Sequence, residues 1–279
     1  MRSHRGSLRA AQHNTENERS FYYFLCYNLP VPRVLHYPRN APKLLVRRQA
    51  RGLRTREAIL RRAVNIASVE GLEGLTVGRL AEELNMSKSG LFAHFGSKED
   101  LQLATVEAAR QLFIDEISRP AMSAPKGMPR LLNLLNLWLG HVERRLFQGG
   151  CFFTAASFEF DDRSGPVRDR VAAIMHEWIA TLGRAVQEAQ DVGHIQAQAS
   201  VHLLTHEIQS LAIGAFWSFQ LLDEKHAYAR ARSIIIEKLQ SVATSSCPPL
   251  PAAAFVKPLA RPFAENKAEI KKSPSREAK

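Results

Sequence analysis

The chain has 279 residues, of which 45% are hydrophobic and 23% are charged. This length and balance fit a globular protein with one large domain or two small ones. Because no apolar run approaches the ~18 residues of a membrane-spanning helix, and none near the start has a signal-peptide pattern, we expect neither a membrane anchor nor a secretion signal. Three widely spaced cysteines, Cys26, Cys151 and Cys247, form no disulfide framework, which predicts a cytoplasmic protein in a reducing environment.

The net charge of +11 is concentrated at the two ends of the chain. Residues 1–54 contribute +9 and residues 244–279 contribute +4, so the residues between them carry −2. A basic protein often binds nucleic acid, but flexible basic tails bind many polyanions without specificity. An argument for DNA binding must therefore rest on the middle of the chain.

Both ends are predicted to be disordered. Residues 1–50 show no sustained helical or strand period, and four prolines interrupt them, namely Pro30, Pro32, Pro38 and Pro42. This basic arm is either a DNA-contacting extension or the product of an upstream start codon. Residues 244–279 are rich in proline, alanine and lysine, which predicts a second disordered tail.

Helical periodicity fills the chain between the tails. Thr55 is the expected N-cap of a first helix that ends at Gly71. Two short helices are expected to begin at Thr76 and Ser87, and the second of these should bury Leu91 and Phe95. A fourth is expected to begin at Ser97, with Asp100 in a variant of the capping box, and its expected buried face is Leu101, Ala104, Ala108, Leu112 and Ile117.

The second half of the chain is also predicted to be helical. Pro120, Pro125 and Gly127 should break the chain before a helix that runs from Pro129 to Gln148, followed by a short apolar segment over 151–160. Pro166 should open a long helix with a buried stripe of Val167, Val171, Ile174, Trp178, Leu182 and Val186. Two more helices are expected over 199–222 and 228–242. Because no alternating strand pattern competes, the predicted fold class is all-α.

The two short helices form a candidate helix-turn-helix. The link Asn85-Met86 requires a residue that tolerates left-handed backbone angles, and Asn is second only to Gly in this respect. The second helix then begins with Ser87, Lys88, Ser89 and Gly90. Small polar residues at the positive end of a helix are typical of a helix that reads DNA, although a generic helical hairpin has similar spacing.

The residues of this region resemble the DNA-binding domain of the TetR (tetracycline-repressor-like) family. The resemblance is carried by Glu70-Gly71, Gly74-Leu75-Thr76-Val77, Leu80-Ala81 and the continuous run from Met86 to Leu101. It implies a three-helix DNA-binding domain over 51–98 and a larger helical ligand-binding and dimerisation domain over 99–243. It also implies a homodimer on a palindromic operator in double-stranded DNA, controlled by a small-molecule effector.

The resemblance also implies roles for individual residues. Ser87, Lys88, Ser89 and Gly90 would face the major groove. Thr76 and Val77 would anchor the preceding helix, while Thr55, Arg56, His94 and Lys98 would approach phosphates. Phe92 stands where the family often has Tyr, so a phenolic contact to phosphate is lost, and Asn85 stands where Gly is usual. Against these roles, Phe92 and Phe95 could be core residues, and His94, Lys88 and Lys98 could be solvated surface groups.

The larger predicted domain offers weaker signals. The segment from Gly149 to Asp169 resembles a regulatory-domain subgroup of the same family, and seven residues are candidate ligand contacts: Trp138, Phe153, Glu159, Met175, Trp178, Phe216 and Trp217. For any single apolar residue among them, a place in the core is the better interpretation, and Glu159 could instead pair with Arg168. His202, His206 and Glu207 are a weak metal signal, and Cys151 is expected to be a buried, inert thiol. No metal and no cofactor are expected.

The last two predicted helices are apolar enough to pair with a second copy of the chain. Their candidate contacts are Leu203, Leu204, Ile208, Leu211, Ile213, Ile234, Ile235 and Leu239. The sequence thus favours a repressor that a ligand releases from its operator. The alternative is a non-inducible, architectural DNA-binding protein that uses the helix-turn-helix and basic tails. An all-α enzyme ranks last, because no nucleophile set, phosphate loop or metal cluster is evident.

Overall fold

A computed structural model describes the backbone of residues 43–251 and the side chains of residues 52–251. The rest of the two predicted tails, residues 1–42 and 252–279, lies outside the described residues. Residues Met1–Thr55 and Arg56–Lys279 form two compact units, and the features below belong to the second. In the described residues of this unit the regular secondary structure is helical, apart from one isolated β-bridge between Ile195 and Ala243. This confirms the all-α prediction.

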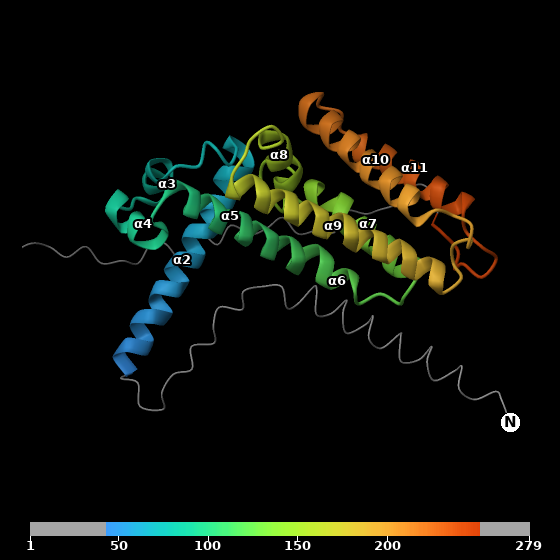
Figure 1. The fold of residues 1–279 in the computed structure, drawn as a ribbon, viewed down its shortest axis with the longest axis horizontal. Helices are drawn as coiled ribbons and strands as arrows, with labels where there is room; N and C mark the ends of the chain where they lie inside the picture. Colours follow the sequence, from blue (N-terminus) through green and yellow to red (C-terminus); the bar gives the residue numbers. More distant parts are fainter. Residues whose placement is uncertain (1–42, 252–279) are drawn as a thin grey trace, which may run out of the picture. The chain divides into compact units, whose positions relative to one another are not determined.

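The first helices form the predicted helix-turn-helix (Figure 1). Helix α2 spans Lys43–Glu70, α3 spans Val77–Leu84 and α4 spans Lys88–Phe95. The predicted starts of α3 and α4 are confirmed to within one residue, because Thr76 and Ser87 cap these helices: each side chain accepts a hydrogen bond from the backbone N–H three residues on. Asn85, between α3 and α4, adopts the left-handed conformation with φ of 50°.

The next helices lead into the larger domain. Helix α5 (Lys98–Phe113), capped by Ser97, continues through a π-helical turn (Ile114–Ser118) into α6 (Arg119–Ala121), and α7 spans Met128–Glu143. Helix α8 (Phe152–Glu159) is followed by the long α9 (Pro166–Asp191), whose predicted buried stripe is confirmed. Helices α10 (Val201–Leu221) and α11 (Ala227–Ser241) complete the order, within two residues of their predicted ends.

The helices of the larger domain pack around one hydrophobic core. In Figure 1, α5 and α9 lie side by side, α8 sits against α9, and α10 and α11 form an antiparallel pair next to α9. Phe147, Leu131, Leu134 and Leu182 are fully buried at its centre. This core is continuous with that of the helix-turn-helix, because Leu101 and Val106 of α5 are buried as well.

Three predictions at the chain ends and in the first helix are wrong. Residues 43–50, assigned to the disordered arm, are helical, and Thr55 lies inside α2 rather than capping it. The residues after Pro42 are rich in Leu, Arg, Gln and Ala, which favour helix strongly enough to tolerate Gly52. At the other end, Thr244 is not in a free tail, because its N–H donates to the His194 carbonyl at 3.2 Å.

One predicted helix end in the larger domain is also wrong. Helix α7 ends at Glu143, not Gln148, because Arg145 turns left-handed with φ of 52° and the Leu146 N–H donates back to the His141 carbonyl at 3.0 Å. The chain breaks between α6 and α7 as predicted, with Pro120 inside the last helical turn, where the wider π-helical turn before it accommodates a residue without an N–H.

The buried face of α5 is rotated from the prediction. Leu101 and the more distant Ile117 are buried as expected, but Thr105, Ala109 and Phe113 form the buried line between them. The predicted Ala104, Ala108 and Leu112 are only partly buried. Apolar periodicity could not locate this face, because it includes Thr105, whose hydroxyl donates to the Leu101 carbonyl at 2.7 Å.

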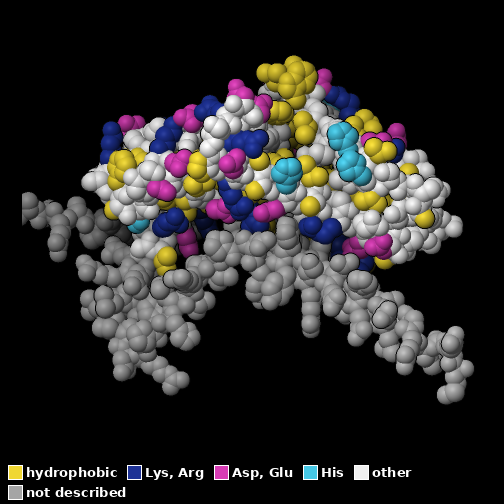
Figure 2. Space-filling model, in the orientation of Figure 1, with side chains coloured by type: hydrophobic (Ala, Val, Ile, Leu, Met, Phe, Trp, Pro, Cys, Tyr) yellow, Lys and Arg dark blue, Asp and Glu magenta, His cyan; other side chains and the backbone are white. Residues whose placement is uncertain are grey.

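The described surface has mixed charge. Figure 2 shows basic and acidic side chains interspersed over the face in view, and a projecting hydrophobic group at the top, where α10 and α11 meet in Figure 1. Exposed apolar residues at the end of α10 are Trp217, Leu221 and Leu222. Among residues 43–251, no helix combines the length and apolar character needed to cross a membrane.

Candidate nucleic-acid interface

The first turn of α4 presents a polar surface to solvent. Ser87, Lys88 and Ser89 are exposed, and Gly90 is partly exposed. The Ser87 hydroxyl accepts from the Gly90 N–H at 3.1 Å and lies 3.3 Å from the Ser89 hydroxyl. Behind this turn, Leu91 and Phe95 are buried and fix α4 on the core. The arrangement leaves the polar end of a short, anchored helix free for a partner.

Thr76 and Lys88 approach the same point at the start of α3. A methyl group added at Gly78 would lie 3.5 Å from Lys88 Cε and 3.8 Å from Thr76 Oγ1, so the end of the Lys88 side chain lies against α3 at Gly78. An ammonium group, a hydroxyl group and the N-terminal N–H groups of α3 therefore lie together. This combination of groups binds phosphate in many proteins.

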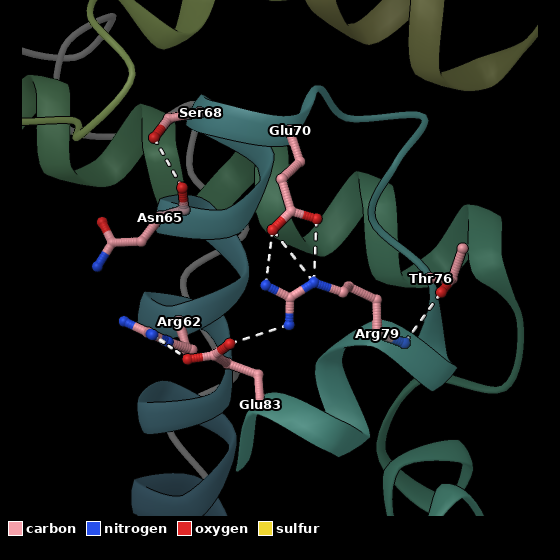
Figure 3. Close-up of polar contacts among 7 residues, drawn as sticks. All are labelled: Arg62, Asn65, Ser68, Glu70, Thr76, Arg79 and Glu83. Atoms are coloured by element: carbon pink, nitrogen blue, oxygen red, sulfur yellow. Dashed lines mark hydrogen bonds and ion pairs between the residues drawn. The ribbon is translucent and has the colours of Figure 1, made fainter.

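Helix α3 is held against α2 by an ion network (Figure 3). The Arg79 guanidinium donates to both Glu70 oxygens, at 2.6–3.1 Å, and to Glu83 at 2.9 Å, while Arg62 pairs with Glu83 from α2. These carboxylates raise the pKa of Arg79, and hydrogen bonds from Arg62 and then Arg79 lower the pKa of Glu83. Because its guanidinium group is bound to both carboxylates, Arg79 is not available as a free cation for DNA.

Three other predicted DNA contacts are tied to the protein itself. The Val77 side chain is buried, so only its backbone N–H remains at the start of α3. The Arg56 guanidinium lies over the Phe95 ring, 5.1 Å from the ring centre. Lys98 forms an ion pair with Glu73, and the hydrogen bond from Lys98 is the main cause that lowers the pKa of Glu73. Lys98 must exchange this partner to reach a phosphate.

The remaining predicted contacts lie on the outer side of α4. Phe92 is 48% exposed, and therefore is not a core residue, while Phe95 is buried as expected. His94 is partly buried, with its ring centre 6.2 Å from that of Phe95. A half-exposed aromatic ring beside the polar first turn extends the accessible face of α4.

Comparison with known families decides what this arrangement is. Residues 59–105 match the family described as "Bacterial regulatory proteins, tetR family", and residues 127–235 match "Tetracyclin repressor-like, C-terminal domain". Together these matches cover both the helix-turn-helix and most of the larger domain. The chain belongs to the TetR family. It is a DNA-binding transcriptional regulator, and its relatives are regulators rather than enzymes.

Two named regulators resemble part of this TetR-family chain. It is 33% identical over 87 residues to the HTH-type transcriptional regulator TcmR of Streptomyces glaucescens, which is 31% of this chain and 37% of that protein. It is 43% identical over 53 residues to the class C tetracycline repressor of Escherichia coli, or 19% of this chain and 24% of that one. The chain thus spans well under half the length of either relative.

Solved structures of the family share the fold over most of the chain. A TetR regulator from Chloroflexus aurantiacus is 23% identical with a TM-score of 0.65, and the match covers 70% of this chain and 98% of that one. A regulator from Saccharomonospora viridis, solved in complex with choline, is 17% identical with a TM-score of 0.59, covering 68% and 98%. At such identities the likeness concerns the fold alone.

Three of the predicted ligand contacts gather around Phe113 in the larger domain of this TetR regulator. The Trp178 ring centre lies 5.1 Å from that of Phe113 and 4.8 Å from that of Trp138, and Phe153 lies 5.8 Å from Phe113. His141 joins the same cluster at 5.8 Å from Phe113. Phe113 and His141 were not among the predicted ligand contacts, because neither stands in a motif and their helices meet only in the fold.

Trp178 Nε1 in this cluster is buried without a hydrogen-bond partner among the described residues, and so is Nη1 of Arg110, one turn before Phe113 on α5. The remaining donors of Arg110 are bound to Glu177, at 2.7 and 2.9 Å. Buried donors usually have partners, so these atoms mark a place where a ligand or water would be stabilised.

Several predicted ligand residues lie elsewhere. Trp217 is 51% exposed, and Phe216 packs on Phe158 of α8, with ring centres 6.4 Å apart. Met175 is partly buried on α9. Glu159 does not pair with Arg168, which instead contacts Asp169 at 3.4 Å; Glu159 binds backbone N–H groups of the α2–α3 loop. Apolar periodicity could not show which face of α10 is covered, so it gave no sign that Trp217 is exposed.

The remaining candidate sites are the possible metal ligands on α10 and the thiol of Cys151. His202 and His206 are exposed, Glu207 pairs with Lys238, and no group of three or more potential metal ligands converges within residues 43–251. Cys151 is buried as expected. Burial acts to raise the pKa of its thiol, but the neighbouring His141 and Thr154 outweigh burial and hold this pKa below its ordinary value. Nothing in the sequence indicates that His141, ten residues before Cys151, lies next to its thiol.

Proposed function

We propose that the chain is a cytoplasmic repressor that binds a palindromic operator as a homodimer and leaves it when a small molecule binds the larger domain. The observation that carries the proposal is the exposed polar first turn of α4, anchored from behind by buried Leu91 and Phe95. In a regulator of this family, such a helix is placed to enter the major groove. Residues 51–98 form the DNA-binding domain in this proposal, and residues 99–243 form the regulatory domain.

The exposed residues divide into two roles. Ser87 and Ser89 would read base edges, because their short side chains reach bases only when the helix lies close to the groove floor, and Gly90 would permit that close approach because it has no side chain. Thr76 and Lys88 would share one phosphate with the backbone N–H of Val77, because they meet at the start of α3. Lys98, His94, Phe92, Arg56 and Thr55 would border the DNA backbone.

The dimer would form through α10 and α11. Of the eight predicted contacts, Leu204, Ile208, Ile235 and Leu239 are buried within the chain, Leu211 and Ile213 are partly buried, and Leu203 and Ile234 are exposed. The exposed fractions of Leu203 and Ile234 are 61% and 48%. Large apolar side chains at this exposure favour burial against a second copy, and a two-fold axis matches a palindromic site.

The effector would bind at the aromatic cluster around Phe113. The rings supply apolar contact, and the unpartnered Trp178 Nε1–H and Arg110 Nη1 supply hydrogen-bond donors. An effector that favours the DNA-free arrangement by ~1–3 kcal/mol would weaken operator binding about 5- to 150-fold. This range is sufficient for a regulatory switch.

Intrinsic fluorescence tests the effector site. The chain has three tryptophans, and Trp178→Phe removes the buried indole N–H while leaving a ring in the cluster. A library compound that releases wild-type protein from operator DNA should bind Trp178→Phe at least tenfold more weakly. Trp217→Phe is the matched control, since Trp217 is exposed, and it should retain affinity. Equal affinity of both variants for every releasing compound would remove the cluster from the proposal.

A further inference from the structure

The C-terminal end of α8 is hydrogen-bonded to the loop that joins α2 to α3. Glu159, the last residue of α8, accepts two backbone hydrogen bonds from residues far back in the sequence. Its Oε2 lies 2.8 Å from the Leu72 nitrogen, and its Oε1 lies 2.7 Å from the Glu73 nitrogen. A carboxylate of the larger domain therefore holds the backbone of the DNA-binding domain. In Figure 1, α8 lies next to the end of α2.

The loop is shaped to receive this carboxylate. Gly71 has a φ of 82°, which L-residues rarely adopt, and a Cβ at Gly71 would lie only 2.9 Å from Glu159 Oε1. On the other side of the contact, Leu72 and Leu75 are buried at 1% and 0% exposure. The loop is thus anchored in the core of the DNA-binding domain and open toward Glu159.

A second contact from the α8–α9 segment reinforces the first. Arg163 Nη1 lies 3.2 Å from Glu73 Oε2, while Lys98 at the start of α5 pairs with the other oxygen of Glu73. Gln102 of α5 donates to the Leu72 carbonyl at 2.8 Å. The loop therefore lies between α5, which leaves the DNA-binding domain, and the α8–α9 segment of the larger domain.

This pair of attachments has a mechanical consequence. Helix α5 runs unbroken from its Ser97 cap into the larger domain, where it packs on α9. A body attached only through α5 can still twist about the axis of that helix. A contact away from the axis, such as the one from Glu159, removes this freedom. The angle at which α4 is presented then depends on α8.

We propose that Glu159 is a positioning residue that sets the angle of the DNA-reading helix on the larger domain, and so sets the half-site spacing that the dimer accepts. The inference rests on the proposed function, since it requires a dimer on two half-sites. Glu159 is only partly buried, and water can reach the loop if the carboxylate is removed. Loss of Glu159 should therefore change the orientation of α4 on the larger domain more than it changes the free energy of unfolding.

Binding to DNA of varied spacing tests the proposal. Once an operator is known, full-length wild type is titrated with the operator, with versions lengthened or shortened by one or two base pairs between half-sites, and with a single half-site. Wild type should prefer native spacing about tenfold or more. Glu159→Ala should reduce that preference to less than about threefold by weakening binding to native spacing, and leave single half-site affinity unchanged.

Two further variants make the result specific. Glu159→Gln keeps one carbonyl oxygen that can accept one N–H, so it should restore part of the spacing preference, and it carries the test if the alanine variant unfolds. Asp161→Ala removes the same charge from an exposed neighbour and should behave like wild type. A wild-type spacing profile in Glu159→Ala, or an equal loss of affinity on every DNA, would overturn the positioning role.

The same titrations distinguish a failure of the proposed function from a failure of the role of Glu159. If wild-type protein shows no palindromic operator and no spacing preference, the proposed function and this inference both fail. If wild type discriminates between spacings and Glu159→Ala discriminates equally well, only the role of Glu159 fails. The wild-type titration therefore separates the two results.

Discussion

Ser89 and Lys88 are neighbours on α4, but their side chains have different surroundings. Ser89 is exposed beside the Ser87 hydroxyl, while Lys88 crosses Gly78 toward Thr76. In the proposed function, Ser89 would therefore read bases and Lys88 would contact phosphate. The family resemblance implies that both residues face the major groove, whereas these surroundings support different roles for the two side chains.

Substitutions at these two positions should separate the roles. Ser89→Ala should change relative affinity among operator base variants by about 1–3 kcal/mol at the contacted pair. Lys88→Ala should weaken binding to all sequences evenly and flatten the dependence of log K on log salt by about one phosphate equivalent. Quantitative binding to an operator variant library, repeated at several salt concentrations, measures both effects. If Ser89→Ala lowered the affinity for every operator variant by the same factor, Ser89 would not read the base sequence.

Lys98 has a protein partner that any phosphate must replace. Its pairing with Glu73 offsets part of its attraction to DNA. We expect Lys98→Ala to reduce the salt slope by about 0.9, and Glu73→Gln to raise DNA affinity by freeing the ammonium group. The remote, exposed Lys225→Ala is the control. An unchanged slope in Lys98→Ala would remove Lys98 from the phosphate contacts.

At the scale of elements, α3 is coupled to α2 by carboxylates whose charge depends on pH. Arg62 and Arg79 lower the pKa of Glu83 from its ordinary value of 4.5. A lowered folded-state pKa stabilises the fold above the unfolded value, and this stabilisation is lost as the pH falls through the lower, folded value. The ion network therefore contributes at neutral pH and disappears in acid.

Thermal unfolding of Glu83→Gln tests this coupling. The variant should melt roughly 1–3 °C below wild type at pH 7, as is usual for a partly exposed ion network. The difference should shrink as the pH is lowered below 4.5. Glu82→Gln, at an exposed neighbouring position, should melt like wild type. A difference that persists unchanged in acid would mean that ionisation of Glu83 is not its cause.

The elements that sequence analysis predicted well are those fixed by neighbouring residues. Thr76, Ser87 and Ser97 each cap a helix through a bond to the residue three positions on, so local chemistry identifies them. The stripe on α9 follows from 3.6-residue periodicity alone. These features located the helix-turn-helix and its exposed first turn without a structure.

The elements that it missed depend on distant or unusual partners. Helix α7 ends at a left-handed arginine, Arg145, where a glycine would have been the usual signal. Glu159 binds backbone atoms 86 and 87 residues earlier in the chain, and a single sequence shows no trace of such a bond. Likewise, Trp217 is apolar, but apolar character does not reveal which face of α10 stays uncovered.

At the scale of the whole molecule, the proposed dimer requires the exposed apolar residues of α10 and α11. Ile234→Glu places a charge in that interface and should weaken dimerisation about 100-fold or more, as expected for a contact worth ~3 kcal/mol. Sedimentation measures the dimer dissociation constant. Palindromic DNA binding should weaken with it, because a monomer engages one half-site.

A matched variant separates dimerisation from folding and DNA contact. Phe92 has the same 48% exposure as Ile234 but lies on α4. Phe92→Glu should therefore leave the dimer intact while it weakens DNA binding by repelling phosphate. If both variants sediment as wild type does, the dimer interface lies elsewhere than α10 and α11.

The distribution of charge also matters at this scale. The strongly basic segments are residues 1–54 and 244–279, while the residues between them carry −2. A specific regulator reads DNA with α4, whereas the architectural alternative binds mainly through the tails. Competition between specific and random DNA distinguishes these two sources of affinity.

The most direct test is therefore a footprinting titration of the purified, full-length protein on the DNA that flanks its own coding region, at about 150 mM salt, with excess random DNA. The proposed function predicts one protected palindrome that survives the competitor and is lost with Ser89→Ala or Ile234→Glu. Complete removal of binding by random DNA would contradict it, and would identify the basic tails as the source of affinity.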